Sequence, residues 1–185
     1  MSTPAETTSG PVSTPENASD SAPVSAVEQR LAELGLTLPE VAAPVAAYVP
    51  AVITGSHVYT SGQLPFINGK LEATGKVSTG TEGASDEPTV SPEDAKAYAA
   101  VCAINALAAI KSVIGDLDRI TRIVKVVGFV SSDPAFTGQP GVINGASELL
   151  GQVFGDAGKH ARSAVGVTVL PLDSPVELEL IAEFS

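Results

Sequence analysis

The stretch HARSAVGVTVLPLDSPVELELIAEF, residues 160–184, decides the fold. Residues 163–170 are rich in β-branched side chains, which favour a strand. Residues 176–184 alternate acidic and apolar side chains with the period of two that is typical of a half-buried strand. The Pro-rich segment between them, residues 171–175, predicts a hairpin loop. We therefore expect two antiparallel strands here that pair with each other.

Two charged side chains in this stretch are candidates for an active site. Arg162 carries a planar guanidinium suited to bidentate binding of a carboxylate, and Glu177 is suited to act as a base or to orient water. The alternative is that both are ordinary charges on an exposed sheet face. The predicted hairpin places them about seven residues apart along the ladder, roughly 20 Å. One site would then contain both only if two copies of the chain contributed to it.

The composition predicts one globular domain with an aliphatic core. The chain has 185 residues, 44% of them hydrophobic, with no Trp. A formal net charge of −11 argues against nucleic acid and anionic membranes as partners. The single cysteine, Cys102, excludes an intrachain disulfide and has the surroundings of a buried apolar residue. No basic residue precedes Arg30, and no apolar stretch suggests a signal peptide or membrane span, so we expect a cytoplasmic location.

The N-terminal half of the sequence divides into segments of clearly different composition. Residues 1–25 are rich in Ser, Thr, Pro and Ala and predict a disordered tail, with one domain over residues 26–185. Residues 27–34 have helical spacing, and two strands are expected at 46–53 and 56–63. Further predictions are a type I′ turn at Asn68-Gly69 and a mobile insert at 75–90.

The remaining segments alternate between helix and strand. Ser91, Pro92 and the acids after them are a helix start, and an apolar stripe predicts that this helix runs to Ile114. A buried strand is expected at 119–130 and a second amphipathic helix at 141–154. The order of these elements predicts an α+β fold, a mixed β-sheet with two main helices packed on one face.

Five short motifs in this order resemble the RidA/YjgF family of enamine/imine deaminases. They are AAYVPAV with Tyr48, YTSGQLP with Ser61 and Gly62, Asn144 near the start of the second main helix, HARSAVGV with Arg162, and VELELIAEF with Glu177. The resemblance covers about residues 46–184. It implies a chorismate-mutase-like fold and a homotrimer with a barrel-like centre and a site between subunits.

The resemblance also implies roles for individual residues. Arg162 binds the substrate carboxylate and Glu177 activates water, so these two are the expected catalytic residues. The other expected substrate-binding residues are Tyr48, Ser61, Gly62, Asn144 and His160. For Ser61 the alternative is a strand-end hydroxyl, for Asn144 a helix-cap or packing residue, and for His160 a loop residue. No metal and no organic cofactor are expected, because the two histidines, His57 and His160, form no ligand cluster in the sequence.

The sequence departs from the family pattern in ways that indicate a divergent subgroup. Ala164 stands where the family has Cys, His160 stands where it has Pro, and the N-terminal extension and the 75–90 insert are additional. Imine hydrolysis needs only a positioned water and proton transfers, so Ala164 does not exclude the reaction.

The resemblance implies that small 2-imino and 2-keto carboxylates are the ligands. The reaction would hydrolyse 2-aminoacrylate or 2-iminobutanoate to a 2-keto acid and ammonia. The alternative is a non-catalytic small-carboxylate-binding or regulatory protein that keeps the arginine but has lost turnover. A third function, ribonuclease or translation inhibitor, is attached to parts of the family, and the net charge of −11 weighs against it.

Overall fold

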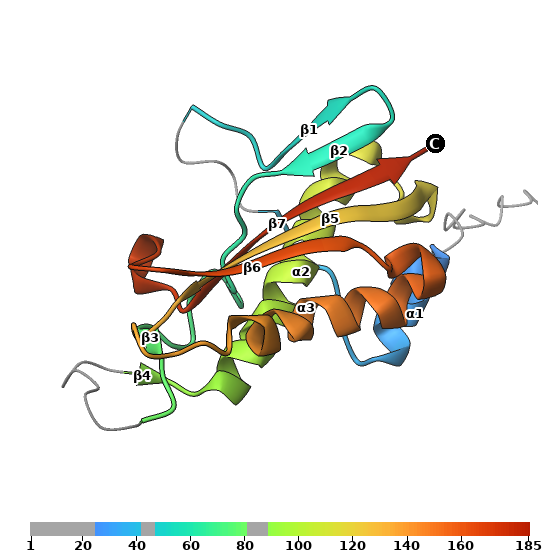
Figure 1. Cartoon of the computed structure of the whole chain (residues 1–185). Coiled ribbons are helices and arrows are strands. Elements are labelled where there is room, and N and C mark those ends of the chain that lie inside the picture. Colours follow the sequence, from blue (N-terminus) through green and yellow to red (C-terminus); the bar gives the residue numbers. More distant parts are fainter. Residues whose placement is uncertain (1–24, 42–46, 81–88) are drawn as a thin grey trace, which may run out of the picture.

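A five-stranded sheet with two long helices on one face forms the body of the molecule (Figure 1). The structure, a computed structural model, describes residues 25–41, 47–80 and 89–185. In chain order the helices and strands are α1 (Ala26–Glu33), β1 (Ala51–Thr54), β2 (His57–Thr60), β3 (Lys76–Val77), β4 (Thr89–Val90), α2 (Pro92–Ile114), β5 (Ile120–Ser131), α3 (Gln139–Phe154), β6 (Ala161–Val167) and β7 (Val176–Phe184). The predicted α+β class is confirmed.

The long helix α2 begins and ends where the sequence predicts. The Ser91 hydroxyl accepts a hydrogen bond from the Asp94 amide at 3.0 Å, which satisfies a free N–H of the first turn. Gly115 follows the last turn with φ +85°, a backbone conformation that residues other than glycine rarely adopt. Gly145 of α3 lies against the carbonyl of Lys96 in α2, so closely that an added Cβ would overlap it. This contact lets the two helices pack tightly.

The N-terminus of α1 is held by a carboxylate that is distant in the sequence. Ser25 donates a hydrogen bond from its hydroxyl to Asp118 at 2.6 Å, and the amides of Ala26 and Val27 donate to the same carboxylate. These bonds lower the pKa of Asp118, and the bond from Ser25 has the largest effect. Ser25 is buried and thus belongs to the fold. The rest of the predicted tail lies outside the described residues.

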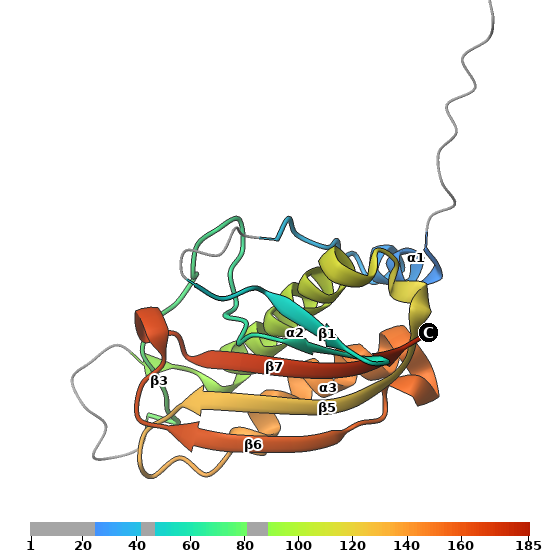
Figure 2. The ribbon, with the colours of Figure 1, turned by 90° about the horizontal axis from the view of Figure 1, so that it is seen from above.

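The strand order is β1-β2-β7-β5-β6, with β6 parallel to β5 and the other neighbours antiparallel. The predicted hairpin of β6 and β7 is therefore wrong. The chain does reverse at residues 171–175, but β5 lies between the two strands (Figure 2). Alternation of side chains identifies a strand without specifying its partner. With β5 between β7 and β6, both edges of the apolar strand β5 are hydrogen-bonded. At the edge of the sheet, one edge of β5 would stay unpaired.

The turns of the first half of the sheet agree with the sequence, although its strands are shorter than predicted. Gly55 with φ +57° connects β1 and β2, and Asn68 and Gly69 both have positive φ in a tight turn. The insert at 75–90 was expected to be a loop throughout. Instead its two ends pair as β3 and β4 in a parallel ladder, with Val77 and Val90 buried. Residues 81–88 lie outside the described residues.

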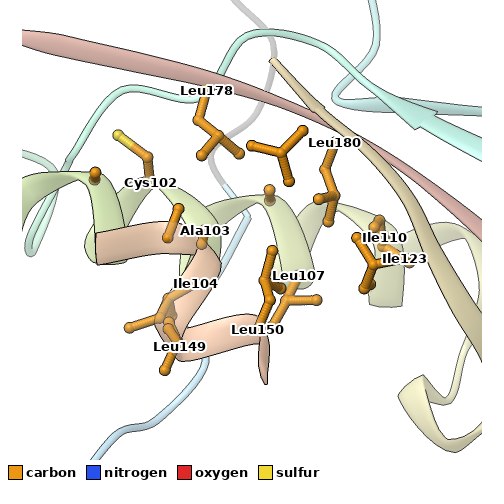
Figure 3. Close-up of a cluster of buried hydrophobic side chains, with 14 of the residues drawn as sticks. Cys102, Ala103, Ile104, Leu107, Ile110, Ile123, Leu149, Leu150, Leu178 and Leu180 are labelled. Atoms are coloured by element: carbon orange, nitrogen blue, oxygen red, sulfur yellow. The ribbon is translucent and has the colours of Figure 1, made fainter. Parts of the chain in front are cut away.

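The core lies between the sheet and the two long helices. Figure 3 shows side chains of β7, β5, α2 and α3 meeting there, among them Leu178, Leu180, Ile123, Leu107 and Leu150. By length and composition alone α2 would qualify as a membrane span, which the sequence analysis did not anticipate. Most of its alanines and all of its isoleucines are instead buried in the core, so the apolar composition of α2 is that of a core helix.

Candidate active site

Arg162 and Glu177 point to opposite faces of the sheet. Arg162 pairs with Val126 of β5, and Glu177 pairs with Phe129 of the same strand. Val126 is fully buried on the helix-covered face, whereas a residue three positions along a regular strand faces the other way. Figure 2 shows the two long helices on one side of the sheet, and we call the other side the open face. The register and the alternating burial of β7 place Glu177 on this open face.

The distance between the two residues is shorter than the hairpin prediction suggested. They lie two strands apart and three residues apart along β5, which corresponds to about 14 Å between Cα atoms. The prediction of roughly 20 Å was wrong because it assumed direct pairing of β6 with β7. Because Arg162 and Glu177 also face opposite sides, one chain does not bring them into a single site.

Arg162 lies at the start of β6 against α3, in a group of polar side chains that we call the arginine cluster. Its Nη1 donates to Asn144 Oδ1 at 2.8 Å and to Ser147 Oγ at 3.1 Å. Within the described residues, its Nε and Nη2 have no hydrogen-bond partner and Arg162 forms no ion pair. One edge of the guanidinium is thus anchored, and the other is available to a carboxylate.

His160 completes the arginine cluster. Its Nδ1 lies 2.6 Å from the carbonyl oxygen of Gly158, and its Nε2 lies 3.0 Å from Ser147 Oγ. Both ring nitrogens therefore have partners within the chain. In the part of the chain that the structure describes, no group of three or more His, Cys, Asp or Glu side chains is placed to hold a metal ion.

Glu177 lies on the open face in very different surroundings, which we call the glutamate cluster. Its side chain is half-buried, and its carboxylate has no hydrogen bond or ion pair with any described residue. Burial, and secondarily the charge of Glu179, raises the pKa of Glu177. A carboxylate in this state is suited to exchange protons with a substrate or a water molecule.

A break in the β2–β7 ladder brings Gly62 against Glu177. The amide of Leu180 donates to the Thr60 hydroxyl at 2.9 Å, and the backbone ladder resumes only where Gln63 pairs with Leu178. Between these points Gly62 lies so close to the Glu177 carboxylate that an added Cβ would overlap Oε1. Glycine at this position therefore makes room for the carboxylate.

Ser61, next to Gly62 in the chain, connects the glutamate cluster to the segment that carries Tyr48. The Ser61 hydroxyl donates to the carbonyl of Val49 at 2.6 Å, and its amide donates to that of Pro50 at 2.9 Å. Ser61 thus fixes the segment that carries Tyr48. The Tyr48 side chain is 55% exposed and lies beside no other aromatic ring among the described residues, so it is free to contact a ligand or another subunit.

The structure therefore divides the predicted site residues between two clusters. Asn144, His160 and Arg162 belong to one, and Gly62 and Glu177 belong to the other. Ser61 adjoins Gly62 in the chain and is bonded to the segment of Tyr48. Asn144 is not a helix cap, because α3 begins at Gln139 and Gly138 precedes it. Its amide oxygen instead holds Arg162.

Ser147 was missed by the sequence analysis. It lies one helical turn after Asn144, so a second polar residue at helical spacing from Asn144 was the available signal.

The position of the family's cysteine and the one cysteine of this chain are both occupied by packing residues. Ala164 packs against the core, and burial raises the pKa of the Cys102 thiol well above its ordinary value.

Comparison with known proteins places the chain in a family. The family model described as "YjgF/chorismate mutase-like, putative endoribonuclease" matches residues 28–184. Protein TCP17 of Trypanosoma cruzi is 41% identical over 160 residues, which are 86% of this chain and 94% of that protein. The crystal structure of the protein Atu1372 from Agrobacterium tumefaciens, described as of unknown function, has a TM-score of 0.76 and 45% identity over 86% of this chain and 93% of that one.

A more distant structure carries a ligand. Escherichia coli TdcF with bound serine has a TM-score of 0.50 and 27% identity, over 80% of this chain and 94% of that one. The strand order, the two covering helices and the match over residues 28–184 agree with the resemblance inferred from the motifs. The chain belongs to the RidA/YjgF family, with its chorismate-mutase-like fold.

Proposed function

We propose that this protein hydrolyses 2-imino and 2-enamino acids to 2-keto acids and ammonia, at sites that two subunits of a homotrimer share. The observation that carries the proposal is that each cluster leaves one charged group without a partner among the described residues. These groups are the free edge of the Arg162 guanidinium and the carboxylate of Glu177. A small substrate with a carboxylate at one end and an imine carbon beside it is suited to both.

The chemistry of the proposed reaction uses these two groups in sequence. Arg162 binds the substrate carboxylate through Nε and Nη2 and so orients the adjacent imine carbon. Glu177 takes a proton from a water molecule as the water oxygen bonds to that carbon, and returns it to the imine nitrogen, so that the C=N double bond becomes a carbinolamine with a hydroxyl and an amine on one carbon. Transfer of the remaining hydroxyl proton to the amine nitrogen then breaks the C–N bond, releasing ammonia as the C=O bond forms. The raised pKa of Glu177 brings it closer to that of the groups with which it exchanges the proton.

The opposite orientation of the two clusters supports a site that is shared between subunits. A second subunit is needed to bring a glutamate cluster to an arginine cluster, and a closed ring of like contacts gives every subunit one partner of each kind. The open face supports such an assembly, because Val52, Tyr59 and Val165 on it are exposed apolar side chains. Three sheets that pack these faces together would form the barrel-like centre that the family resemblance implies.

The comparisons support a small amino-acid-like ligand. The TdcF structure contains serine, which carries an α-carboxylate as the proposed substrates do. The description of the family also names endoribonuclease. A net charge of −11 does not favour a phosphate backbone as ligand, so we do not propose that activity.

A coupled assay tests the proposal. A pyridoxal-phosphate amino-acid dehydratase and its substrate supply the imine, and keto-acid formation is followed with and without this protein. We expect wild-type protein to accelerate keto-acid release and Glu177→Gln to lose that acceleration while still binding 2-ketobutyrate. Binding of 2-ketobutyrate without any acceleration by wild-type protein would instead establish the non-catalytic carboxylate-binding alternative.

A further inference from the structure

We infer that Ser147 and His160 form a directional hydrogen-bond relay that positions Arg162, so that His160 acts on the carboxylate clamp from outside the ligand site. No part of the family resemblance assigns such a role, because the family pattern has Pro where this chain has His160. The contacts that carry the inference are Gly158 O to His160 Nδ1, His160 Nε2 to Ser147 Oγ, and Ser147 Oγ to Arg162 Nη1.

The direction of the relay follows from its first member. The carbonyl oxygen of Gly158 has no hydrogen to give, so the 2.6 Å contact requires that Nδ1 of His160 carries the proton. In the neutral ring Nε2 is then an acceptor. The hydroxyl of Ser147, 3.0 Å away, therefore donates to Nε2.

That donation fixes what the Ser147 oxygen offers to Arg162. With its hydrogen directed at His160, the oxygen presents lone pairs to Arg162 Nη1, which lies 3.1 Å away. Without the imidazole acceptor the hydroxyl is free to rotate, and its hydrogen then competes for the position facing Nη1. His160 thus holds Ser147 in the orientation that accepts from the guanidinium.

The relay supplements a second anchor. Asn144 Oδ1 accepts from the same Nη1 at 2.8 Å, so two acceptors one helical turn apart on α3 hold a single nitrogen. Together they fix the plane of the guanidinium and leave the Nε–Nη2 edge facing away from α3. Ser147 and His160 are therefore positioning residues, and loss of either leaves Arg162 charged but less ordered.

Two matched substitutions of His160 separate the relay from simple packing. In His160→Gln the side-chain amide reaches the position of Nε2, so it can still accept from Ser147. In His160→Asn the amide reaches only the position of Nδ1, so the bond to Gly158 is retained and the acceptor for Ser147 is lost. Ser147→Ala removes the relay at its centre, and the double variant with His160→Asn shows whether His160 acts through Ser147.

Two measurements on the full-length protein need no ligand. Nitrogen-15 NMR of the neutral imidazole reports which nitrogen carries the proton. We expect the Nδ1–H form. The order parameter of the Arg162 Nε–H group reports its mobility, and we expect it to fall in Ser147→Ala and in His160→Asn but not in His160→Gln.

A third measurement rests on the proposed function. Calorimetric titration with 2-ketobutyrate should show affinity about three- to tenfold weaker in Ser147→Ala and His160→Asn, the range for loss of one hydrogen bond, with no further loss in the double variant. If wild-type protein does not bind 2-ketobutyrate, the proposed function fails while the NMR measurements still decide the relay. An Nε2–H ring in the wild type, or unchanged Arg162 mobility in both variants, would overturn the relay.

Discussion

The arginine cluster and the glutamate cluster lie on opposite faces of one sheet and are built in opposite ways. Arg162 is held by hydrogen bonds to Asn144 and Ser147, so its position is fixed and the Nη1 donors are already used. Glu177 instead adjoins a glycine, and none of the described residues donates a hydrogen bond to its carboxylate. The contrast matches the two roles that we propose for these residues. A binding cation benefits from a fixed geometry, whereas a proton-transferring carboxylate benefits from a poorly stabilised charge.

The largest expected effect comes from inactivating one cluster in one chain and the other cluster in a second chain. Arg162→Ala and Glu177→Ala should each abolish turnover. If the site is shared between subunits, co-refolding the two variants returns a wild-type pair to about one site in four under random mixing. Steady-state deaminase activity of the mixture measures this fraction, and mass spectrometry verifies that subunits have mixed. Mixed oligomers without activity would show that the two clusters do not meet.

A substitution at Gly62 should disturb the glutamate cluster alone. The added methyl group in Gly62→Ala overlaps Glu177 Oε1 and displaces the carboxylate. We expect turnover to fall by about 10²-fold, the cost of a misplaced catalytic group, with 2-ketobutyrate binding at Arg162 retained. The matched control is Gly141→Ala in α3, where nothing lies within 4 Å of the new atom. Equal losses in both variants would indicate a general effect on folding.

A substitution at Arg162 should disturb the arginine cluster alone. Arg162→Lys keeps the charge but cannot hold Asn144 and Ser147 on one side while gripping a carboxylate on the other. We expect at least about tenfold weaker binding of 2-ketobutyrate, close to that of Arg162→Ala, in calorimetric titration. Near-normal affinity of the lysine variant would remove the bidentate clamp from the mechanism.

The smallest expected effect concerns the pKa of Glu177. As a base it must be ionised, so turnover should fall as the pH decreases through its raised pKa, and this acid limb lies above the ordinary range of glutamate. Glu179→Gln removes the lesser of the two causes of the raised pKa and should move the limb of kcat/KM to lower pH, with most of the elevation remaining because burial is unchanged. Glu183→Gln, the same change further along β7, should leave the limb in place.

Local signals in the sequence predicted most of the fold. The caps at Ser91 and Gly115, the positive-φ turn at Asn68-Gly69 and the apolar stripes gave the helices and the first turns within a few residues. Ser25 was assigned to the tail because nothing local shows that Asp118, about ninety residues away, bonds to it. Local composition does not reveal a partner so distant in the chain.

Strand pairing was the part that sequence reasoning could not supply. A reversal at residues 171–175 is compatible both with direct pairing of β6 and β7 and with a third strand between them. The choice depends on the total burial of β5, which is a property of the assembled sheet. The same limit affected the site, because the motifs supply only candidate residues, whereas the register shows that Arg162 and Glu177 face apart.

The central position of β7 also has a consequence for biosynthesis. Residues 176–184 come last among the strands, yet they lie between β2 and β5 and pair with both. Until this segment leaves the ribosome, the nascent chain can form α2, β5 and α3, but β2 and β5 each have an unpaired edge. The sheet therefore closes in one late step, and an incomplete chain exposes two strand edges that are prone to aggregation. A ribosome that stalls shortly before residue 176 would release a product for degradation, because such a chain lacks the strand that joins the two halves of the sheet.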